Sequence, residues 1–239
     1  MTPATLTSLI DATWPAKSMR DVDGWTIREG AGGGSRVSAA TATRDANLEG
    51  HPLAASAMRQ LGQTPLFMVR AGEEKLDALL ESDGYIIKDP TTFYTAPTDM
   101  LATQRPPAVT CFQVWPPLAA QAEIWAAGGI DTARLAIMER ARGAKTTVLG
   151  RVNDTPAGTA FAAVRDSTAM IHAIETAAAF RRQGLGRHML TAMSFWAKDQ
   201  GADTVALLVT RANVGANALY TSLGMTPVGG YHYRIKPEA

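Results

Sequence analysis

Two glycines between a strand-like segment and an amphipathic helix constrain the fold of this chain more than any other feature. Thr168–Thr176 is typical of a β-strand, and residues 184–200 carry an apolar stripe at helical spacing. Between them lies the run Phe180-Arg181-Arg182-Gln183-Gly184-Leu185-Gly186-Arg187-His188. Glycine lets the backbone approach a ligand closely, and a helix N-terminus presents N–H groups without partners. Such a turn is typical of a phosphate-binding site, and here arginines flank it.

Composition indicates a globular protein with room for two domains. The 239 residues are 46% hydrophobic and 19% charged, and the net charge of +1 gives no field that would attract nucleic acid or a membrane. No apolar run reaches membrane-spanning length, and residues 1–10 lack the pattern of a signal peptide. The one cysteine, Cys111, cannot form an intrachain disulfide. We therefore expect a cytoplasmic protein without a nucleic-acid or membrane partner.

The C-terminal part of the chain predicts a mixed α/β domain. Period-two and period-3.6 patterns alternate along it, with Asp131 as an expected helix N-cap and Gly224 as a helix C-cap. The expected strands are 108–115, 146–152, 158–164, 168–176, 203–210 and 226–235, and the expected helices are 118–128, 131–142, 184–200 and 214–223.

A change of composition near residues 95–108 predicts a linker. Proline fixes its own φ and restricts the residue before it, so the prolines here interrupt every periodic pattern. We expect an N-terminal domain over residues 1–95, a proline-rich linker over 96–107 and a C-terminal domain over 108–239.

The N-terminal part repeats the end of the C-terminal pattern. A shift of 140 residues places 64–93 on 204–233 without a gap, and both segments predict a strand, a short helix, a glycine and a strand. Upstream, 24–29 and 36–42 predict a hairpin around the glycine-rich residues 30–34. The stretch equivalent to the phosphate turn, 41–46, contains no glycine. We expect a degenerate copy without a ligand site, although strand–helix–strand patterns also recur by chance.

These features together resemble the GNAT superfamily of acyl-CoA-dependent N-acyltransferases. The resemblance depends on Arg181-x-x-Gly184-x-Gly186, on the helix after it, and on the later motif Asn213-x-x-Ala216-x-x-Leu219-Tyr220-x-x-x-Gly224-Met225. It implies an α/β fold with a GNAT-type, mostly antiparallel twisted sheet flanked by helices, here in tandem. Two central strands of that sheet would splay apart to admit a CoA thioester.

The resemblance also implies the residues that would bind acetyl-CoA, the acyl-donor co-substrate. Main-chain groups of Arg182, Gln183, Gly184, Leu185, Gly186 and Arg187 would hold the pyrophosphate, beside Arg181. Ile174 and Thr176 would pair with the pantetheine amides through their main chains. Asn213 would lie near the pantetheine, but an asparagine there is also an ordinary helix N-cap. Arg181 and Arg182 are equally compatible with solvated surface charges.

The resemblance assigns Tyr220 to protonate the departing thiolate, because a phenol with a pKa of ~10 stays protonated at neutral pH. Alternatively, Tyr220 fills a gap between helix and sheet. Glu175 is the candidate general base, acting through water, and otherwise a solvent-facing carboxylate. Cys111 is expected to be a buried structural thiol.

We predict no metal site, because the four histidines have no ligand spacing among themselves or with Cys111. His172 and His232 are candidates for lining an acceptor pocket.

The expected function is an N-acetyltransferase that transfers an acetyl group to a primary amine of a small molecule. A non-catalytic acyl-CoA sensor and a protein N-terminal or lysine acetyltransferase remain alternatives. The N-terminal domain would shape the acceptor site, cover apolar surface or mediate a homodimer.

Overall fold

The computed structural model of the chain describes residues 3–237. The strands are β1 (Ser18–Val22), β2 (Trp25–Glu29), β3 (Thr41–Ala42), β4 (Leu66–Arg70), β5 (Ile86–Pro97), β6 (Cys111–Val114), β7 (Lys145–Val152), β8 (Thr155–Arg165), β9 (Thr168–Thr176), β10 (Thr204–Thr210) and β11 (Thr226–Ile235). The α-helices are α1 (Pro3–Thr13), α2 (Ser35–Ser38), α3 (His51–Gln60), α4 (Glu74–Ser82), α5 (Thr98–Leu101), α6 (Ala119–Ala127), α7 (Thr132–Arg140), α8 (Leu185–Asp199) and α9 (Val214–Ser222).

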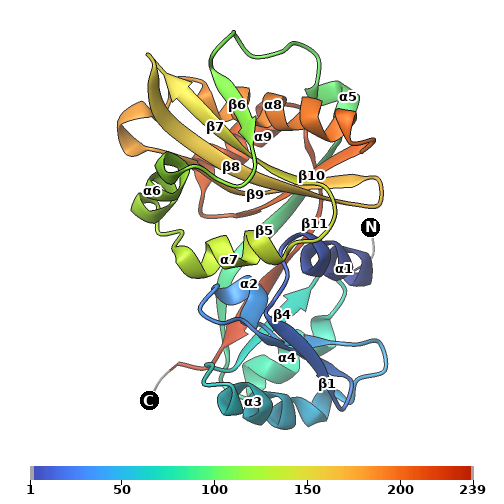
Figure 1. Cartoon of the computed structure of the whole chain (residues 1–239). Helices are drawn as coiled ribbons and strands as arrows, with labels where there is room; N and C mark the ends of the chain where they lie inside the picture. Colours follow the sequence, from blue (N-terminus) through green and yellow to red (C-terminus); the bar gives the residue numbers. More distant parts are fainter. Residues whose placement is uncertain (1–2, 238–239) are drawn as a thin grey trace.

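One eight-stranded sheet runs through the molecule in the order β4-β11-β5-β10-β9-β8-β7-β6, with a small β1-β2-β3 sheet in the first half (Figure 1). Of the strand pairs in the large sheet, β9–β10 is parallel and the others that the structure describes are antiparallel. The predicted mixed α/β class with a mostly antiparallel sheet is confirmed. No helix within residues 3–237 has the length and apolarity needed to cross a bilayer.

Strands β5 and β11 exchange places between the two halves of the chain. β5 comes from the first half, yet it pairs with β10 on one side and with β11 on the other. β11 comes from the second half and lies between β4 and β5. Figure 1 shows both strands crossing between the upper and lower parts of the molecule. Each half therefore completes the sheet of the other.

The 140-residue repeat predicted from the sequence is present in the structure. Helices α4 and α9 coincide residue for residue under that shift. The register of the exchanged strands is symmetric as well, because Ile86 pairs with Ile235 and Thr95 pairs with Thr226. Under the shift each of these pairs maps onto the other, as a pseudo-two-fold axis between β5 and β11 requires.

Both faces of the sheet are covered at its centre. On β8, Ala160 and Ala162 face the core beneath α8, whereas Phe161 between them belongs to the opposite core. There it packs with Trp14, the residue that follows α1, and with Trp125 of α6. The N-terminal helix thus covers part of the sheet built by the second half. This packing is a second contact between the halves, in addition to the exchange of β5 and β11.

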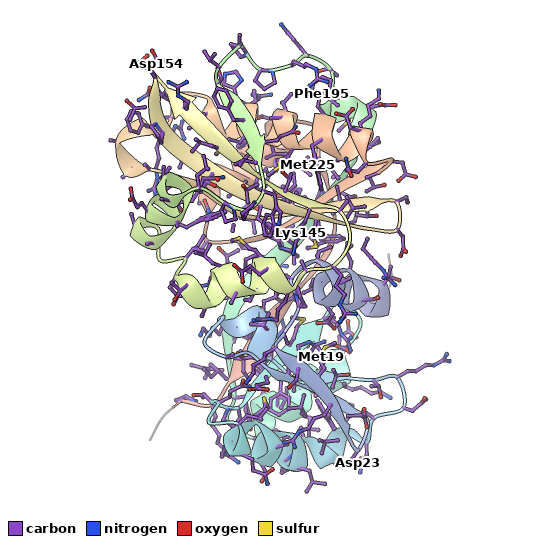
Figure 2. All side chains as sticks on the ribbon, in the orientation of Figure 1. Met19, Asp23, Lys145, Asp154, Phe195 and Met225 are labelled. Carbon is purple, nitrogen blue, oxygen red and sulfur yellow. The ribbon has the colours of Figure 1, made fainter. Side chains whose placement is uncertain are left out.

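Two tight turns mark opposite ends of the molecule. In the β7–β8 turn Asn153 and Asp154 have φ of +47° and +63°, which is the geometry of a two-residue hairpin. The β1–β2 turn uses Asp23 and Gly24 with φ of +52° and +79°. Figure 2 shows Asp154 and Asp23 at the two ends. The first turn lies between the two strands that the sequence predicts at 146–152 and 158–164.

The hairpin predicted around residues 30–34 is wrong. The hairpin of the first half is β1–β2. Residues 36–38 of the expected strand 36–42 are instead in α2, and β3 is limited to two residues. The glycine-rich loop packs against the second half: a Cβ on Gly33 would lie 2.4 Å from Cδ1 of Ile137 on α7. Close approach to α7, rather than a hairpin turn, explains this glycine.

The segment expected to be a linker, 96–107, starts inside β5 and continues into α5. Residues 102–110 follow without a helix or strand. β5 therefore passes through the boundary expected at residue 95, since its main chain pairs with β10 as far as Pro97.

We predict that Phe93→Ala lowers the free energy of unfolding by about 3–5 kcal/mol, because it leaves a cavity in the core. Phe93 is 1% exposed on β5. Ile87→Ala on the same strand is the control; Ile87 is 51% exposed, so its loss is expected to cost less than about 1 kcal/mol. Thermal unfolding followed by circular dichroism and tryptophan fluorescence measures both. Because the halves share β5, both variants should unfold in one transition, and two separate transitions would contradict the exchange.

Candidate functional site

Strands β9 and β10 part in the middle of the sheet. Their parallel pairing runs from Thr168–Thr204 to Ile171–Leu207 and stops there, although both strands continue. Past that point the edge of β9 over residues 172–176 has no partner on β10. Main-chain groups along such an edge can pair with an extended ligand as an added strand. Ile174 and Thr176, expected to contact a cofactor through their main chains, both lie in this segment.

A β-bulge bends β9 where it leaves β10. The pairing with β8 shifts between Phe161–His172 and Thr159–Glu175, so residues 173 and 174 have no paired counterpart. Ala173 has a φ of +51°, and its carbonyl accepts a hydrogen bond from Trp125 Nε1 at 2.8 Å. A bulge redirects main-chain groups away from the neighbouring strand, and bulges concentrate next to functional sites.

The glycine turn leads from this open edge into α8. Arg182 and Gly184 have φ of +65° and +81°, and Gly184 is the helix N-cap. The main-chain N–H groups of residues 182–186 have no acceptor within the described part of the chain. The Gln183 side chain turns back to the Ala179 carbonyl, at 3.4 Å. Unpaired N–H groups at the positive end of a helix dipole form an anion-binding site.

The two glycines of the turn have different structural reasons. A Cβ on Gly184 would meet no protein atom nearer than His188 Nε2 at 4.0 Å, so packing does not require a glycine here. Its positive φ favours glycine, and the missing side chain leaves open space for a ligand. A Cβ on Gly186 would lie 3.2 Å from Leu219 Cδ2. Gly186 therefore also allows α8 to pack against α9. Leu185, between them, is 2% exposed and contributes its side chain to the core.

The three arginines around the turn differ in their partners. Arg181 Nε donates to the Thr176 carbonyl at 3.0 Å, which holds the turn against the end of β9. Arg187 Nη2 donates to Ser222 Oγ on α9 at 2.9 Å. Arg182 is exposed and has no hydrogen bond or ion pair within residues 3–237. Arg182 is thus the arginine of the three whose guanidinium is fully available to a ligand.

Glu175 lies at the end of the open edge and is not solvent-facing. Its Oε1 accepts from Arg181 Nη2 at 3.1 Å, and its side chain is 18% exposed. Gly128, after α6, lies against it, because a Cβ there would be 2.7 Å from the carboxyl carbon. The carboxylate is therefore fixed in position by an ion pair beside the bulge.

Tyr220 on α9 is 5% exposed and belongs to the core beneath α8. Its ring packs edge-on against Tyr94 of β5, with centroids 5.7 Å apart. Burial, and secondarily Tyr94, raise the pKa of Tyr220 to about 12. No hydrogen bond to its hydroxyl exists within residues 3–237, and the oxygen is not fully enclosed. The side chain thus fills a gap between helix and sheet and still keeps a phenol proton available to a ligand.

The start of α9 is fixed by a polar network that the sequence indicated only in part. Asn213 Oδ1 accepts from Ala216 N at 3.1 Å, the expected N-cap. Asn217 Nδ2 donates to the Thr210 carbonyl at 3.0 Å, and its Oδ1 accepts from Tyr94 Oη at 3.1 Å. Tyr94 and Asn217 were not predicted, because no local pattern shows that a strand of the first half meets α9.

A cavity of about 330 Å³ lies where the two halves meet the gap between β9 and β10. Ala173 and Thr210 line it from the parted strands, Arg36 and Asp89 from the first half, and Tyr231 from β11. This volume is in the range of small-molecule sites. The cavity was not predicted as a set of residues, since only the tertiary fold brings these segments together.

The two histidines proposed for an acceptor pocket do not line this cavity. His232 Nε2 pairs with Asp77 Oδ1 at 2.8 Å. His172 is buried: its Nε2 lies 2.9 Å from Thr13 Oγ1 and its Nδ1 accepts from Arg36 Nη1 at 3.2 Å. Burial, and then Arg36, lower its pKa well below the ordinary value, so His172 is neutral. Among the described residues, no group of three or more His, Cys, Asp or Glu side chains is placed to hold a metal ion.

We predict that Cys111 reacts slowly with thiol reagents in the folded protein. Burial raises its pKa to about 12. Relative to an ordinary thiol, the thiolate fraction at pH 8 then falls by about 1,000-fold, and the thiolate is the reactive form. Stopped-flow reaction with Ellman's reagent, compared with the unfolded protein in denaturant, measures the difference. Equal rates in the two states would contradict this account.

Comparison with known proteins gives the family of the second half. Residues 110–225 match the family model described as "Acetyltransferase (GNAT) family". The uncharacterized N-acetyltransferase YobR of Bacillus subtilis is 38% identical over 56 residues, which make up 23% of this chain and 23% of YobR. The chain thus matches about a quarter of that relative.

Solved structures share the fold over nearly the whole chain. A conserved protein of unknown function from Staphylococcus epidermidis has a TM-score of 0.73 at 14% identity, covering 96% of this chain and 97% of its own. A GCN5-related N-acetyltransferase from Kribbella flavida has a TM-score of 0.72 at 18% identity, covering 99% and 96%. A tandem GNAT protein from the clavulanic acid biosynthesis pathway has a TM-score of 0.60 at 15% identity, covering 84% and 76%.

The open edge of β9, the glycine turn and Tyr220 all lie inside the matched segment. The chain therefore has a GNAT fold, and its residues 110–225 are a domain of the GNAT acetyltransferase family.

Proposed function

We propose that this protein is an acetyl-CoA-dependent N-acetyltransferase that acetylates a primary amine of a small molecule by direct attack. The observation that carries the proposal is the continuity of the open β9 edge at 172–176 with the unpaired N–H groups of residues 182–186. A ligand with an extended amide chain that ends in a pyrophosphate matches both features. The family match and the description of YobR as an N-acetyltransferase support acyl-CoA as that ligand.

Different residues would bind different parts of acetyl-CoA. Main-chain N–H groups of residues 182–186 would hold the pyrophosphate, with Arg182 and Arg187 adding positive charge. Ile174 and Thr176 would pair with the pantetheine amides through their main chains. Asn213 would act through α9, whose first turn it caps. Arg181 would position Glu175 and the end of β9 rather than contact phosphate directly.

The reaction forms a C–N bond and breaks the C–S bond of the thioester. Most alkyl amines are protonated at neutral pH, so the attacking nitrogen must first lose a proton. Glu175 would accept that proton through water, since its carboxylate is held beside the bulge. Main-chain N–H groups near Thr176 would stabilise the oxyanion of the tetrahedral intermediate.

Tyr220 would stabilise the departing sulfur by donating a hydrogen bond. Burial raises its pKa to about 12, so the phenol stays protonated. Complete transfer of the proton to a thiolate with a pKa near 8.5 would be uphill by about 5 kcal/mol. A hydrogen bond to the developing charge requires no transfer, and water can then supply the proton of the free thiol.

The first half would be a degenerate GNAT-like copy that supplies structure and part of the acceptor cavity. Leu80 stands where the second half has Tyr220, and 41–46 has no glycine turn. The first half also closes one side of the cavity, which favours a small amine over a peptide. We propose a cytoplasmic location, in agreement with the single cysteine, Cys111, which is half-buried rather than fully buried as expected from the sequence.

We predict that Gly184→Ala weakens acetyl-CoA binding by about 10- to 100-fold, because the methyl group displaces the pyrophosphate from its N–H donors. Gly201→Ala is the matched control: Gly201 has a φ of +78° and open space around it, and it lies after α8, away from the turn. Both variants should lose about 1–2 kcal/mol of stability from the positive φ. Isothermal titration calorimetry with acetyl-CoA measures affinity. Equal affinity in the two variants would refute pyrophosphate binding at the glycine turn. Absence of acetyl-CoA binding by folded wild type would refute the proposed function.

We predict that Tyr220→Phe lowers kcat by about 100-fold or more and leaves acetyl-CoA affinity unchanged, because the phenol acts in the transition state. Tyr94→Phe, in the same aromatic pair, should lose the Asn217 hydrogen bond and retain kcat within a few-fold. Thiol release measures both. The raised pKa further implies that activity does not fall near pH 10 through ionisation of Tyr220. An alkaline limb near pH 10 that disappears in Tyr220→Phe would contradict this.

The same measurements separate the rival functions. Acetyl-CoA binding without thiol release from any amine would favour an acyl-CoA sensor. Acetylation of peptide amines in preference to free amines would favour a protein acetyltransferase.

A further inference from the structure

We infer that the acceptor is a small amine that carries a carboxylate, such as a free amino acid, and that Arg36 and Arg134 bind that carboxylate from the two halves of the chain. This inference rests on the proposed acetyltransferase function and specifies its acceptor. It depends on the charges that line the 330 Å³ cavity.

Arg36 brings an unpaired positive charge to the cavity. Its guanidinium is always protonated in proteins. Its Nη1 donates to the neutral ring of His172 at 3.2 Å and its Nε to Tyr231 Oη at 3.4 Å. Within residues 3–237 no carboxylate forms an ion pair with it, so neutral groups, including the Tyr233 hydroxyl, are its partners. A partly buried charge without an opposite charge is unfavourable unless a ligand supplies one.

Arg134 brings a second such charge from α7. Its Nη1 donates to the Gly129 carbonyl, and its Nη2 lies near Gly34, where a Cβ would be only 3.1 Å away. The guanidinium of Arg134 therefore extends from the second half to the first-half loop that leads to Arg36. The part of the chain that the structure describes contains no ion pair to this side chain either.

Tyr231 offers a third donor at the same place. Its hydroxyl oxygen accepts from Arg36 Nε and from Tyr233 Oη, the latter at 3.2 Å. The two acceptor positions of a phenol are then occupied, and its own proton has no acceptor among the described residues. Two guanidinium groups and one hydroxyl donor thus line one cavity, a donor set that matches a carboxylate.

The remaining charge of the cavity limits what the anion can be. Asp89 is the acidic side chain among the lining residues, so the lining has a net charge of about +1. A singly charged carboxylate fits this balance better than a phosphate dianion, which Asp89 would repel.

The cavity also places a bound amino acid next to the reacting centre. Ala173 of the bulge and Thr210 at the end of β10 line it, so it opens onto the gap between the parted strands. Gly128, another lining residue, lies against the Glu175 side chain. An amine held here through its carboxylate therefore lies beside both the open β9 edge and the candidate base.

The experiment compares L-alanine, L-leucine, L-phenylalanine and L-glutamate with their α-amides as acceptors, with acetyl-CoA and thiol release as the readout. We expect kcat/KM for at least one free acid to exceed that of its amide by about tenfold or more, because the amide loses charged hydrogen bonds. Arg36→Gln and Arg134→Gln should each raise KM for the acid by about tenfold and leave the amide unchanged. Arg165→Gln is the matched control, since Arg165 is exposed, pairs with Asp166 and lies outside this cavity.

A second readout does not depend on turnover. The same acids should raise the melting temperature of wild type more than the amides do, and this difference should vanish in Arg36→Gln and Arg134→Gln, whose own melting temperatures show whether they fold. Turnover of amines without preference for the acids, or acids and amides that stabilise wild type equally, would overturn the inference. Selective stabilisation by acids without any thiol release would support the inference and refute the proposed reaction.

Discussion

The main-chain pairing of β5 and β11 is the constraint on which the rest of this structure depends. Each strand lies between two strands of the opposite half, so removing either would leave two strand edges with unpaired N–H and C=O groups in the middle of a sheet. Exposed strand edges of this kind promote aggregation, and a half-chain would present them at its apolar core. The exchange therefore joins two copies of one pattern into a single cooperative sheet, and it fixes where α9 and α4 lie relative to one another.

The candidate site lies at the seam created by this exchange. The glycine turn and the open β9 edge come from the second half alone, which agrees with the family match to residues 110–225. The surroundings of Tyr220, in contrast, come from both halves. Tyr94 of β5 packs against the ring of Tyr220 and donates a hydrogen bond to Asn217, one helical turn before it. The cavity proposed for the acceptor likewise needs α2 and β5 of the first half. A half that lacks a glycine turn of its own thus still builds the site of its partner.

The sequence predicted best what depends on local pattern. β9 and β11 have the predicted bounds, and α9 and its Asn213 cap agree with the prediction. The expected helix 184–200 begins one residue later, at Leu185, with Gly184 as its N-cap at a φ of +81°. Contacts between elements that are distant in the sequence could not be predicted from local pattern. Glycines at 30–34 look like a turn, but Gly33 is explained by Ile137 of the other half. Nothing near Arg36 or Tyr94 indicates that they meet His172 and Tyr220, because periodicity describes one element and not its neighbours.

The pseudo-symmetry explains how one copy keeps a phenol without a hydrogen-bond partner at the position of Tyr220 and the other does not. Tyr94 of β5 contacts Asn217 of α9 by a neutral hydrogen bond, and the 140-residue shift maps this pair onto Arg234 of β11 and Asp77 of α4. Arg234 Nε donates to Asp77 Oδ1 at 2.6 Å and holds the pKa of that carboxyl below its ordinary value. The first half therefore fixes its helix to the exchanged strand with an ion pair and buries the apolar Leu80 beneath it. The second half makes the same junction without charge, which leaves Tyr220 beside a neutral partner with its hydroxyl unpaired. The same strand exchange thus serves as a structural junction in one copy and as the support of a hydrogen-bond donor in the other.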